Sequence, residues 1–237
     1  MPSDARLCLF GDSHIACVKQ ALDGMDPPPE IALWGVAGNR FRQLVMQDGA
    51  LQAGDAETAA RVADVAGADR PALRPGDFDV VFFLSARVRV HRVFMELLSR
   101  PCRDTGHLSA AMSRAYVAEQ LRQHAGYGWA AEFARAGEAE IVFMPAPLET
   151  DGIAEVPDRF APGLTAGRAE REAVWTLIAD VMDEDGIVLA PQPEATIARG
   201  FLTAGAYAAE GAAEARDPAH KNAAFGALVV QAALDFL

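Results

Sequence analysis

The 237-residue sequence predicts an α/β protein in which helices cover both faces of a parallel sheet. Short apolar runs closed by glycine or proline alternate with longer segments of helical periodicity along the chain. The runs lack the polar alternation of a strand with one wet face, as is typical of strands buried on both sides. The sequence also contains no internal repeat and no low-complexity linker. We therefore expect one domain spanning residues 1–237.

Five apolar runs are the predicted strands: Leu7–Phe10, Ile31–Trp34, Val80–Leu84, Ile141–Met144 and Ile187–Leu189. Helices are predicted near residues 14–22, 39–47, 91–99, 109–136, 168–184 and 219–236. For the last helix, Asp217 is the expected N-cap and Pro218 the expected first helical residue. Because right-handed crossovers between parallel strands use helices, this alternation places helices on both faces of the sheet.

Two longer segments, residues 48–78 and residues 145–167, interrupt the pattern. The first is rich in Ala, Asp and Gly, and the second in Pro and Gly. Loops that follow the carboxyl ends of parallel strands surround the ligand crevice. Residues 145–167 are therefore expected to form a substrate wall or lid, or else an idle surface excursion. Together with residues 101–110, they are the segments expected to shape a pocket.

The composition excludes several classes of partner. The chain has 33 Asp and Glu against 21 Lys and Arg, a formal net charge of −12 at pH 7. Binders of nucleic acid or anionic membranes normally need a basic surface, so neither partner is expected. There is no apolar run of about 18 residues and no basic segment leading into one, which predicts a cytoplasmic protein.

Motifs for cofactors are also lacking in the sequence. The three cysteines Cys8, Cys17 and Cys102 form no Cys-x-x-Cys pair, so we expect neither a disulfide framework nor a zinc knuckle. No Gly-x-Gly-x-x-Gly or phosphate-binding loop motif occurs, so no nucleotide cofactor is expected. We expect the protein to function with no cofactor and no metal.

The first predicted strand ends in Gly11-Asp12-Ser13-His14. A serine between a buried strand and a helix lies at the carboxyl edge of the sheet, with its N–H at the positive end of the helix. There its hydroxyl could act as a nucleophile and its N–H could stabilise an oxyanion. The alternative is that Ser13 or Asp12 only caps the helix. His14, next to Ser13, is expected to pack or to form hydrogen bonds.

A serine nucleophile needs a base, and His220 is the best candidate among the five histidines. Asp217 stands three residues earlier, where its carboxylate can fix the tautomer of the ring and support the imidazolium. A helix N-terminus beside the ring would keep it neutral at rest. His91, His107 and His124 show no metal-ligand spacing.

The two end motifs, Gly11-Asp12-Ser13-His14 and Asp217-Pro218-Ala219-His220, together resemble those of the SGNH/GDSL hydrolase family. That family has its nucleophilic serine in the first motif and an Asp-x-x-His pair in the last. The resemblance implies a catalytic triad of Ser13, His220 and Asp217 in a flavodoxin-like three-layer α/β/α fold with about five parallel strands. It also implies an esterase that removes a small acyl group, such as acetyl, from a carbohydrate or other small molecule. The family includes acyltransferases as well.

The family's middle motifs match less well. Gly38 is the best match for the glycine that donates its N–H to the oxyanion. After the third strand, where the family has Gly-x-Asn, this chain has Ser85-Ala86-Arg87. Losing one oxyanion donor costs about 2.7–4 kcal/mol of transition-state stabilisation unless another group replaces it.

Arg87 therefore has several interpretations. Its guanidinium could donate to the oxyanion or anchor an anionic substrate group. Asn39, beside Gly38, could instead supply the amide. The site could also have lost catalysis and act as a non-catalytic ligand-binding domain. A separate alternative is that Arg87 has no functional role and is an ordinary solvated or ion-paired side chain, like Arg89 and Arg92.

Overall fold

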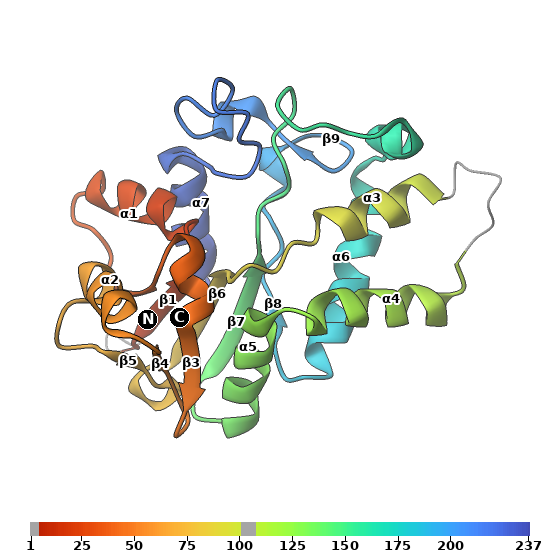
Figure 1. The fold of residues 1–237 in the computed structure, drawn as a ribbon. Helices are drawn as coiled ribbons and strands as arrows, with labels where there is room; N and C mark the ends of the chain where they lie inside the picture. The colour runs from red at the N-terminus through yellow and green to blue at the C-terminus, as the bar shows by residue number, and fades with distance from the viewer. Residues whose placement is uncertain (1–4, 101–107) are drawn as a thin grey trace.

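The computed structural model describes residues 5–100 and 108–237, so Cys102, His107 and the rest of residues 101–107 lie outside the described residues. Its main sheet consists of β1 (Leu7–Gly11), β2 (Ile31–Gly35), β6 (Val80–Ser85), β7 (Glu140–Pro145) and β8 (Val188–Leu189). These strands are parallel and lie in the order β2-β1-β6-β7-β8 (Figure 1). Numbered among themselves, they run 2-1-3-4-5, the flavodoxin-like order. The predicted fold class is confirmed.

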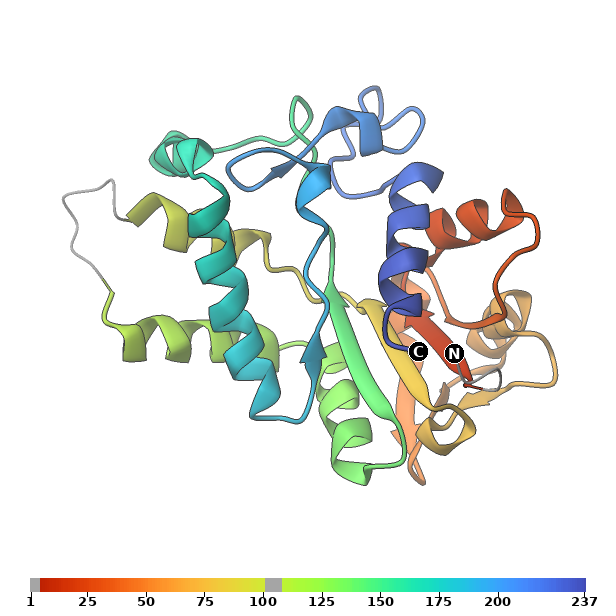
Figure 2. The ribbon, with the colours of Figure 1, turned by 180° about the vertical axis from the view of Figure 1, so that it is seen from behind.

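Helices flank this sheet on both sides (Figures 1 and 2). They are α1 (Ile15–Asp23), α2 (Ala56–Ala66), α3 (His91–Ser99), α4 (Ala110–Arg122), α5 (Ala125–Ala136), α6 (Arg168–Asp183) and α7 (Ala223–Leu234). Short 3-10 segments are η1 (Gly38–Gln43), η2 (Pro75–Asp77), η4 (Asp158–Thr165), η5 (Glu194–Thr196) and η6 (Gly205–Tyr207). No helix within the described residues is long and apolar enough to cross a membrane.

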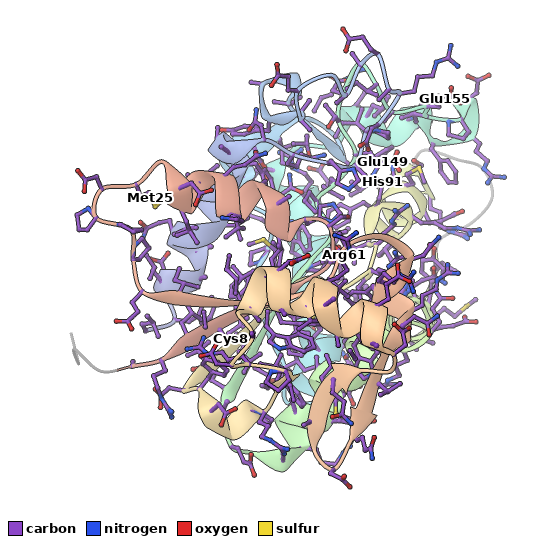
Figure 3. All side chains as sticks on the ribbon, turned by 60° about the vertical axis from the view of Figure 1, so that its left-hand side comes forward. Cys8, Met25, Arg61, His91, Glu149 and Glu155 are labelled. Carbon is purple, nitrogen blue, oxygen red and sulfur yellow. The ribbon has the colours of Figure 1, made fainter. Side chains whose placement is uncertain are left out.

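Successive side chains along a strand belong to two different hydrophobic clusters. Leu7 and Leu9 of β1 face the cluster that contains the apolar residues of α1 and α7. Cys8 and Phe10 face the other cluster, to which α2–α6 contribute. Cys8 is fully buried, and this burial raises the pKa of its thiol, so it behaves as a small apolar residue (Figure 3). Burial of both strand faces explains the unbroken apolar runs.

The predictions of a helix at 39–47 and of an irregular stretch at 48–78 are wrong. After η1 the chain forms an antiparallel sheet of β3 (Leu44–Gln47), β4 (Ala50–Ala53) and β5 (Ala72–Leu73). Asp48 and Gly49 both have positive φ, 52° and 70°, as a two-residue hairpin turn requires. The Asp-Gly pair was the sequence signal for this hairpin.

Two other predicted boundaries differ from the structure. The single helix at 109–136 is two helices, α4 and α5, because His124 adopts an extended backbone at the N-cap of α5. The last helix starts at Ala223, and its N-cap is Asn222, whose side chain accepts from the Phe225 N–H. Asp217 and Pro218 therefore precede the helix. A small antiparallel pair, β9 (Ile197–Arg199) and β10 (Leu202–Thr203), lies between β8 and α7 in the chain.

Helices α1 and α7 pack with their backbones in contact at Gly226. A Cβ at this position would lie 2.0 Å from the Cys17 carbonyl oxygen and 2.9 Å from the Val18 nitrogen. Only glycine permits this approach. It also brings together the two loops, just before α1 and just before α7, that carry Ser13 and His220.

Gly226→Ala is therefore expected to destabilise the protein by about 1–3 kcal/mol, because the new methyl group forces the two helices apart. Gly128→Ala in α5 is the matched control, since its Cβ would meet no atom within 4 Å. This control should be neutral or stabilising by about 0.5–1 kcal/mol. Urea denaturation of both variants measures the difference, and equal stabilities would contradict the packing argument.

Candidate active site

The predicted site residues from opposite ends of the chain meet at the carboxyl edge of the sheet. Ser13 follows β1, and Arg87 follows β6, the neighbouring strand. This is the position where the strand order reverses, which is where ligands bind in such sheets. A cleft of about 870 Å³ opens here. It is lined by Asp12, Ser13, His14, Gly38, Phe41, Arg42, Leu44, Arg87, Arg89, Gln123, His124, Ala125, Gly126, Trp129, Ala219 and His220.

Ser13, His220 and Asp217 form a continuous hydrogen-bonded chain. His220 Nε2 lies 2.9 Å from Ser13 Oγ, and His220 Nδ1 lies 2.5 Å from Asp217 Oδ2. An ionised carboxylate can only accept, so the proton on Nδ1 belongs to the imidazole. Nε2 is then the acceptor that faces the serine hydroxyl. The three groups thus have the geometry of a nucleophile, a base and an orienting carboxylate.

A tight turn, not a helix start, presents His220. Asp217 Oδ1 accepts from the backbone N–H groups of Ala219 and His220, at 3.0 and 3.3 Å. Partial burial would raise the pKa of Asp217, but the hydrogen bond from the His220 ring and those two N–H groups together lower it. Asp217 therefore shapes the turn and holds the ring at the same time.

Lys221 stabilises this turn through hydrogen bonds. Its buried ammonium donates to the carbonyl oxygens of Pro218 and Ala219 and to Thr150 Oγ1, at 2.8–3.0 Å. Burial lowers its pKa to about 8. Thr150 also donates its backbone N–H and its hydroxyl to the Pro218 oxygen. The sequence analysis missed Lys221, although it directly follows the Asp-x-x-His motif.

The segment 145–167 supports the site without lining the cleft. Besides Thr150, it contributes Glu149, whose backbone N–H donates to His91 Nδ1 at 3.5 Å and whose carboxylate lies 3.4 Å from His91 Nε2. Burial lowers the pKa of His91 to about 4, so the ring is neutral beside the Glu149 carboxylate (Figure 3). The segment that was expected to form a substrate wall or lid therefore supports the turn that carries His220.

Asp12 ties the ends of β1 and β6 together. Its buried carboxylate accepts from the N–H and Nδ1 of His14, from Ser85 Oγ and from the Arg87 N–H, at 2.8–3.0 Å. Burial alone would raise its pKa, but these hydrogen bonds and the charge of His14 lower it to about 2. Ser85, Ala86 and Arg87 all have positive φ, from 41° to 63°, which is costly for residues other than glycine. The carboxylate holds this turn in place.

His14 packs directly on His220. Its ring stacks on that of His220, with centroids 5.3 Å apart and planes 24° apart. Its Nδ1 is bonded to Asp12. Its buried Nε2 has no hydrogen-bond partner among the described residues. His14 thus has the packing and hydrogen-bonding position expected from the sequence.

The groups suggested as oxyanion donors are not all placed to act in the cleft. The N–H of Ser13 forms no backbone hydrogen bond within the described residues, and Gly38 begins η1, so its N–H has no partner inside that helix. Gly38 has a φ of 65°, which favours glycine. Asn39 is exposed and is not among the residues that line the cleft. The Arg87 Nη2 group donates to the Gly38 carbonyl oxygen, and the guanidinium lies 5.7 Å from the Phe41 ring centroid.

The far wall of the cleft was missed by sequence reasoning. It comes from the junction of α4 and α5, which supplies Gln123, His124 and Trp129. Trp129 also packs on Phe41, with ring centroids 5.3 Å apart. Burial, with a smaller contribution from Arg89, lowers the pKa of His124. No local motif marks these residues, because only the packing of α5 brings them to the cleft.

No group of three His, Cys, Asp or Glu side chains in residues 5–100 and 108–237 is arranged to hold a metal ion. No protein-family model and no curated protein matches the chain.

Solved structures that the chain is similar to include an extracellular lipase from Streptomyces rimosus, with 13% identity, a TM-score of 0.45, and coverage of 98% of this chain and 99% of that one. Another is a catalytic mutant of an acetylxylan esterase from Geobacillus stearothermophilus, with 15% identity, a TM-score of 0.38, and coverage of 99% and 94%. A third is the periplasmic domain of a lipopolysaccharide acetyltransferase from Salmonella ser. Paratyphi A, with 12% identity, a TM-score of 0.41, and coverage of 98% and 84%.

Proposed function

We propose that the protein is a serine esterase of the SGNH/GDSL type that removes a small acyl group from a carbohydrate or other small molecule. The observation that carries this proposal is the chain of contacts from Asp217 through His220 to Ser13, at 2.5 and 2.9 Å. A hydroxyl, an imidazole and a carboxylate in this order, beside a cleft, are the components of acyl transfer through a covalent intermediate.

In the proposed reaction, His220 Nε2 takes the hydroxyl proton while Ser13 Oγ bonds to the ester carbonyl carbon. Asp217 supports the imidazolium, and the N–H groups of Ser13 and Gly38 donate to the oxyanion. His220 then gives its proton to the leaving oxygen as the carbon–oxygen bond breaks. A water molecule, deprotonated by His220, then bonds to the acyl carbon, and His220 returns that proton to Ser13 Oγ as the bond between Oγ and the acyl carbon breaks. The same steps with an alcohol in place of water would make the protein an acyltransferase.

Arg87 has a positioning role in this proposal. By donating to the carbonyl of Gly38, its guanidinium holds the start of η1, and with it the Gly38 N–H, against the end of β6. The family has an asparagine amide at this position, so Arg87 also favours a second candidate function. In that alternative, the protein binds a ligand in the cleft without cleaving it.

A fluorophosphonate probe distinguishes the two candidates, because it reacts only with an activated serine. We expect covalent labelling of the wild type, which mass spectrometry should locate on Ser13, and no labelling of Ser13→Ala. Ser113→Ala in α4 is the matched control and should be labelled like the wild type. If the folded wild type is not labelled and does not hydrolyse short p-nitrophenyl esters, the ligand-binding alternative is favoured.

A further inference from the structure

The cleft beside Ser13 carries positive charge in a strongly acidic protein. Arg42, Arg87 and Arg89 line it, and Asp12 is the one acidic residue among its described lining residues. Asp12 is 5% exposed and accepts four hydrogen bonds, so its charge is already compensated inside the fold. The chain as a whole has a formal net charge of −12. The distribution of charge in the cleft is therefore opposite to that of the protein.

Other cavities of the protein lack this excess of positive charge. Four other cavities formed by the described residues are each lined by at least as many carboxylates as arginines. The cavity beside Pro218, for example, is lined by Glu149, Glu155 and Arg216. The general preference for arginine over lysine in this sequence does not explain why the excess of positive charge lies in the cavity that contains the proposed nucleophile.

Two of the three guanidinium groups remain free to bind. Arg42 and Arg89 are exposed, and neither forms an ion pair or a hydrogen bond within the described part of the chain. Burial raises the pKa of Glu149 although the charge of Arg89 opposes the shift, and its carboxylate lies 3.4 Å from His91 Nε2 and does not line the cleft. Arg87 is held by the Gly38 carbonyl and contributes its positive charge from a fixed place.

The three arginines that line the cleft come from two segments of the chain. Arg42 belongs to η1, whereas Arg87 and Arg89 lie on the segment between β6 and α3. Phe41, Leu44 and Trp129 supply apolar surface in the same cleft. A ligand held here would pair an anionic group with the guanidinium forks and lay an apolar part on the aromatic rings.

We propose that the ester substrate carries an anionic group, a carboxylate or a phosphate, which Arg42, Arg87 and Arg89 bind while Ser13 attacks the ester. This inference rests on the proposed esterase function and names the substrate class of the same site. The anionic group takes no part in bond breaking, and its binding holds the ester carbonyl next to Ser13.

The test compares esters that differ only in charge. On the alcohol side, para-acetoxybenzoate is paired with para-acetoxybenzamide. On the acyl side, p-nitrophenyl hydrogen glutarate is paired with p-nitrophenyl glutaramate. For each pair, the ratio of kcat/KM for the anionic and neutral member is measured in the wild type, in Arg42→Gln and in Arg89→Gln. Arg61→Gln, on the exposed surface of α2, is the matched control (Figure 3).

We expect the wild type to prefer the anionic member of at least one pair by about 10-fold or more, as a charge-assisted contact would give. The ratio should fall several-fold in Arg42→Gln or Arg89→Gln and should fall as salt is added, because salt screens exposed charges. Arg61→Gln should keep the wild-type ratio. Which pair responds tells whether the anionic group belongs to the alcohol or to the acyl part.

Calorimetric titration of Ser13→Ala with para-acetoxybenzoate and para-acetoxybenzamide separates the two proposals. Hydrolysis of the neutral esters with ratios near one in both pairs would overturn the anionic substrate and leave the esterase standing. Absence of all hydrolysis, with tighter binding of the benzoate than the benzamide, would overturn the esterase and support the anion site. Absence of both hydrolysis and any binding preference would overturn both proposals.

Discussion

Replacing His220 with alanine is expected to lower kcat for ester hydrolysis by about 10⁴- to 10⁶-fold, with little change in KM. The physical reason is that no other imidazole among residues 5–100 and 108–237 is bonded to the Ser13 hydroxyl. His14 stacks on His220, but its Nδ1 is bonded to Asp12 and its Nε2 is buried. Without His220, the serine hydroxyl has no base to take its proton, and binding in the cleft is largely kept.

Steady-state kinetics measures this loss, and free imidazole provides the control. The His220 side chain is 42% exposed, so added imidazole can reach the space left in His220→Ala and should restore part of the rate. Asp217→Asn keeps the ring but removes the charge that supports the imidazolium, so it should lose roughly 10²- to 10⁴-fold. A His220→Ala enzyme that retains more than a tenth of the wild-type kcat would contradict the assignment of the base.

Asp12→Ala is expected to destabilise the fold by about 3–5 kcal/mol, the range measured when one partner of a buried charged pair is removed. The substitution leaves the His14 ring, the Ser85 hydroxyl and the Arg87 N–H without their acceptor. It also releases the turn in which three successive residues hold positive φ. Activity should fall as well, because Arg87 and the Gly38 that it holds are no longer positioned.

Urea denaturation at several pH values tests the role of Asp12. Its pKa is about 2 in the folded protein against 3.8 when unperturbed, so the unfolded chain binds the proton first as the pH falls. The wild type should therefore lose about 2 kcal/mol of this stabilisation between about pH 4 and pH 2. Asp12→Ala should lack that acid-sensitive part. Asp23→Ala, an exposed carboxylate paired with Lys19, is the control and should change stability by less than about 1 kcal/mol.

An equal loss in Asp12→Ala and Asp23→Ala would contradict the role of Asp12. Asp12→Asn adds a further check, because it keeps one side-chain acceptor and loses the charge. It should lie between the wild type and Asp12→Ala in both stability and activity.

The sequence was sufficient to predict the main sheet because its strands are buried on both faces. Leu7–Phe10 and Val80–Leu84 have no polar alternation, and this pattern depends only on burial. The auxiliary hairpin at Asp48-Gly49 was missed because its short strands lack long apolar runs, so only the turn residues mark it. The break between α4 and α5 was missed because helical periodicity continues past His124.

Within the site, the residues at strand ends could be predicted and the supporting residues could not. Ser13 directly follows a buried strand, and His220 stands at a recognisable spacing from Asp217. The contacts of Lys221 with Thr150 and the placement of Trp129 depend on how distant segments pack. Such packing leaves no local pattern in the sequence, which explains why the far wall of the cleft appears only in three dimensions.

The wide separation of Ser13 and His220 has a consequence for synthesis of the protein. The two side chains that form the 2.9 Å contact lie 207 residues apart in the chain. During translation, Ser13 is made 207 residues before His220, so it lacks this contact until residue 220 has left the ribosome and α7 has docked on α1. In the proposed esterase, the serine hydroxyl therefore gains its base only as the fold is completed.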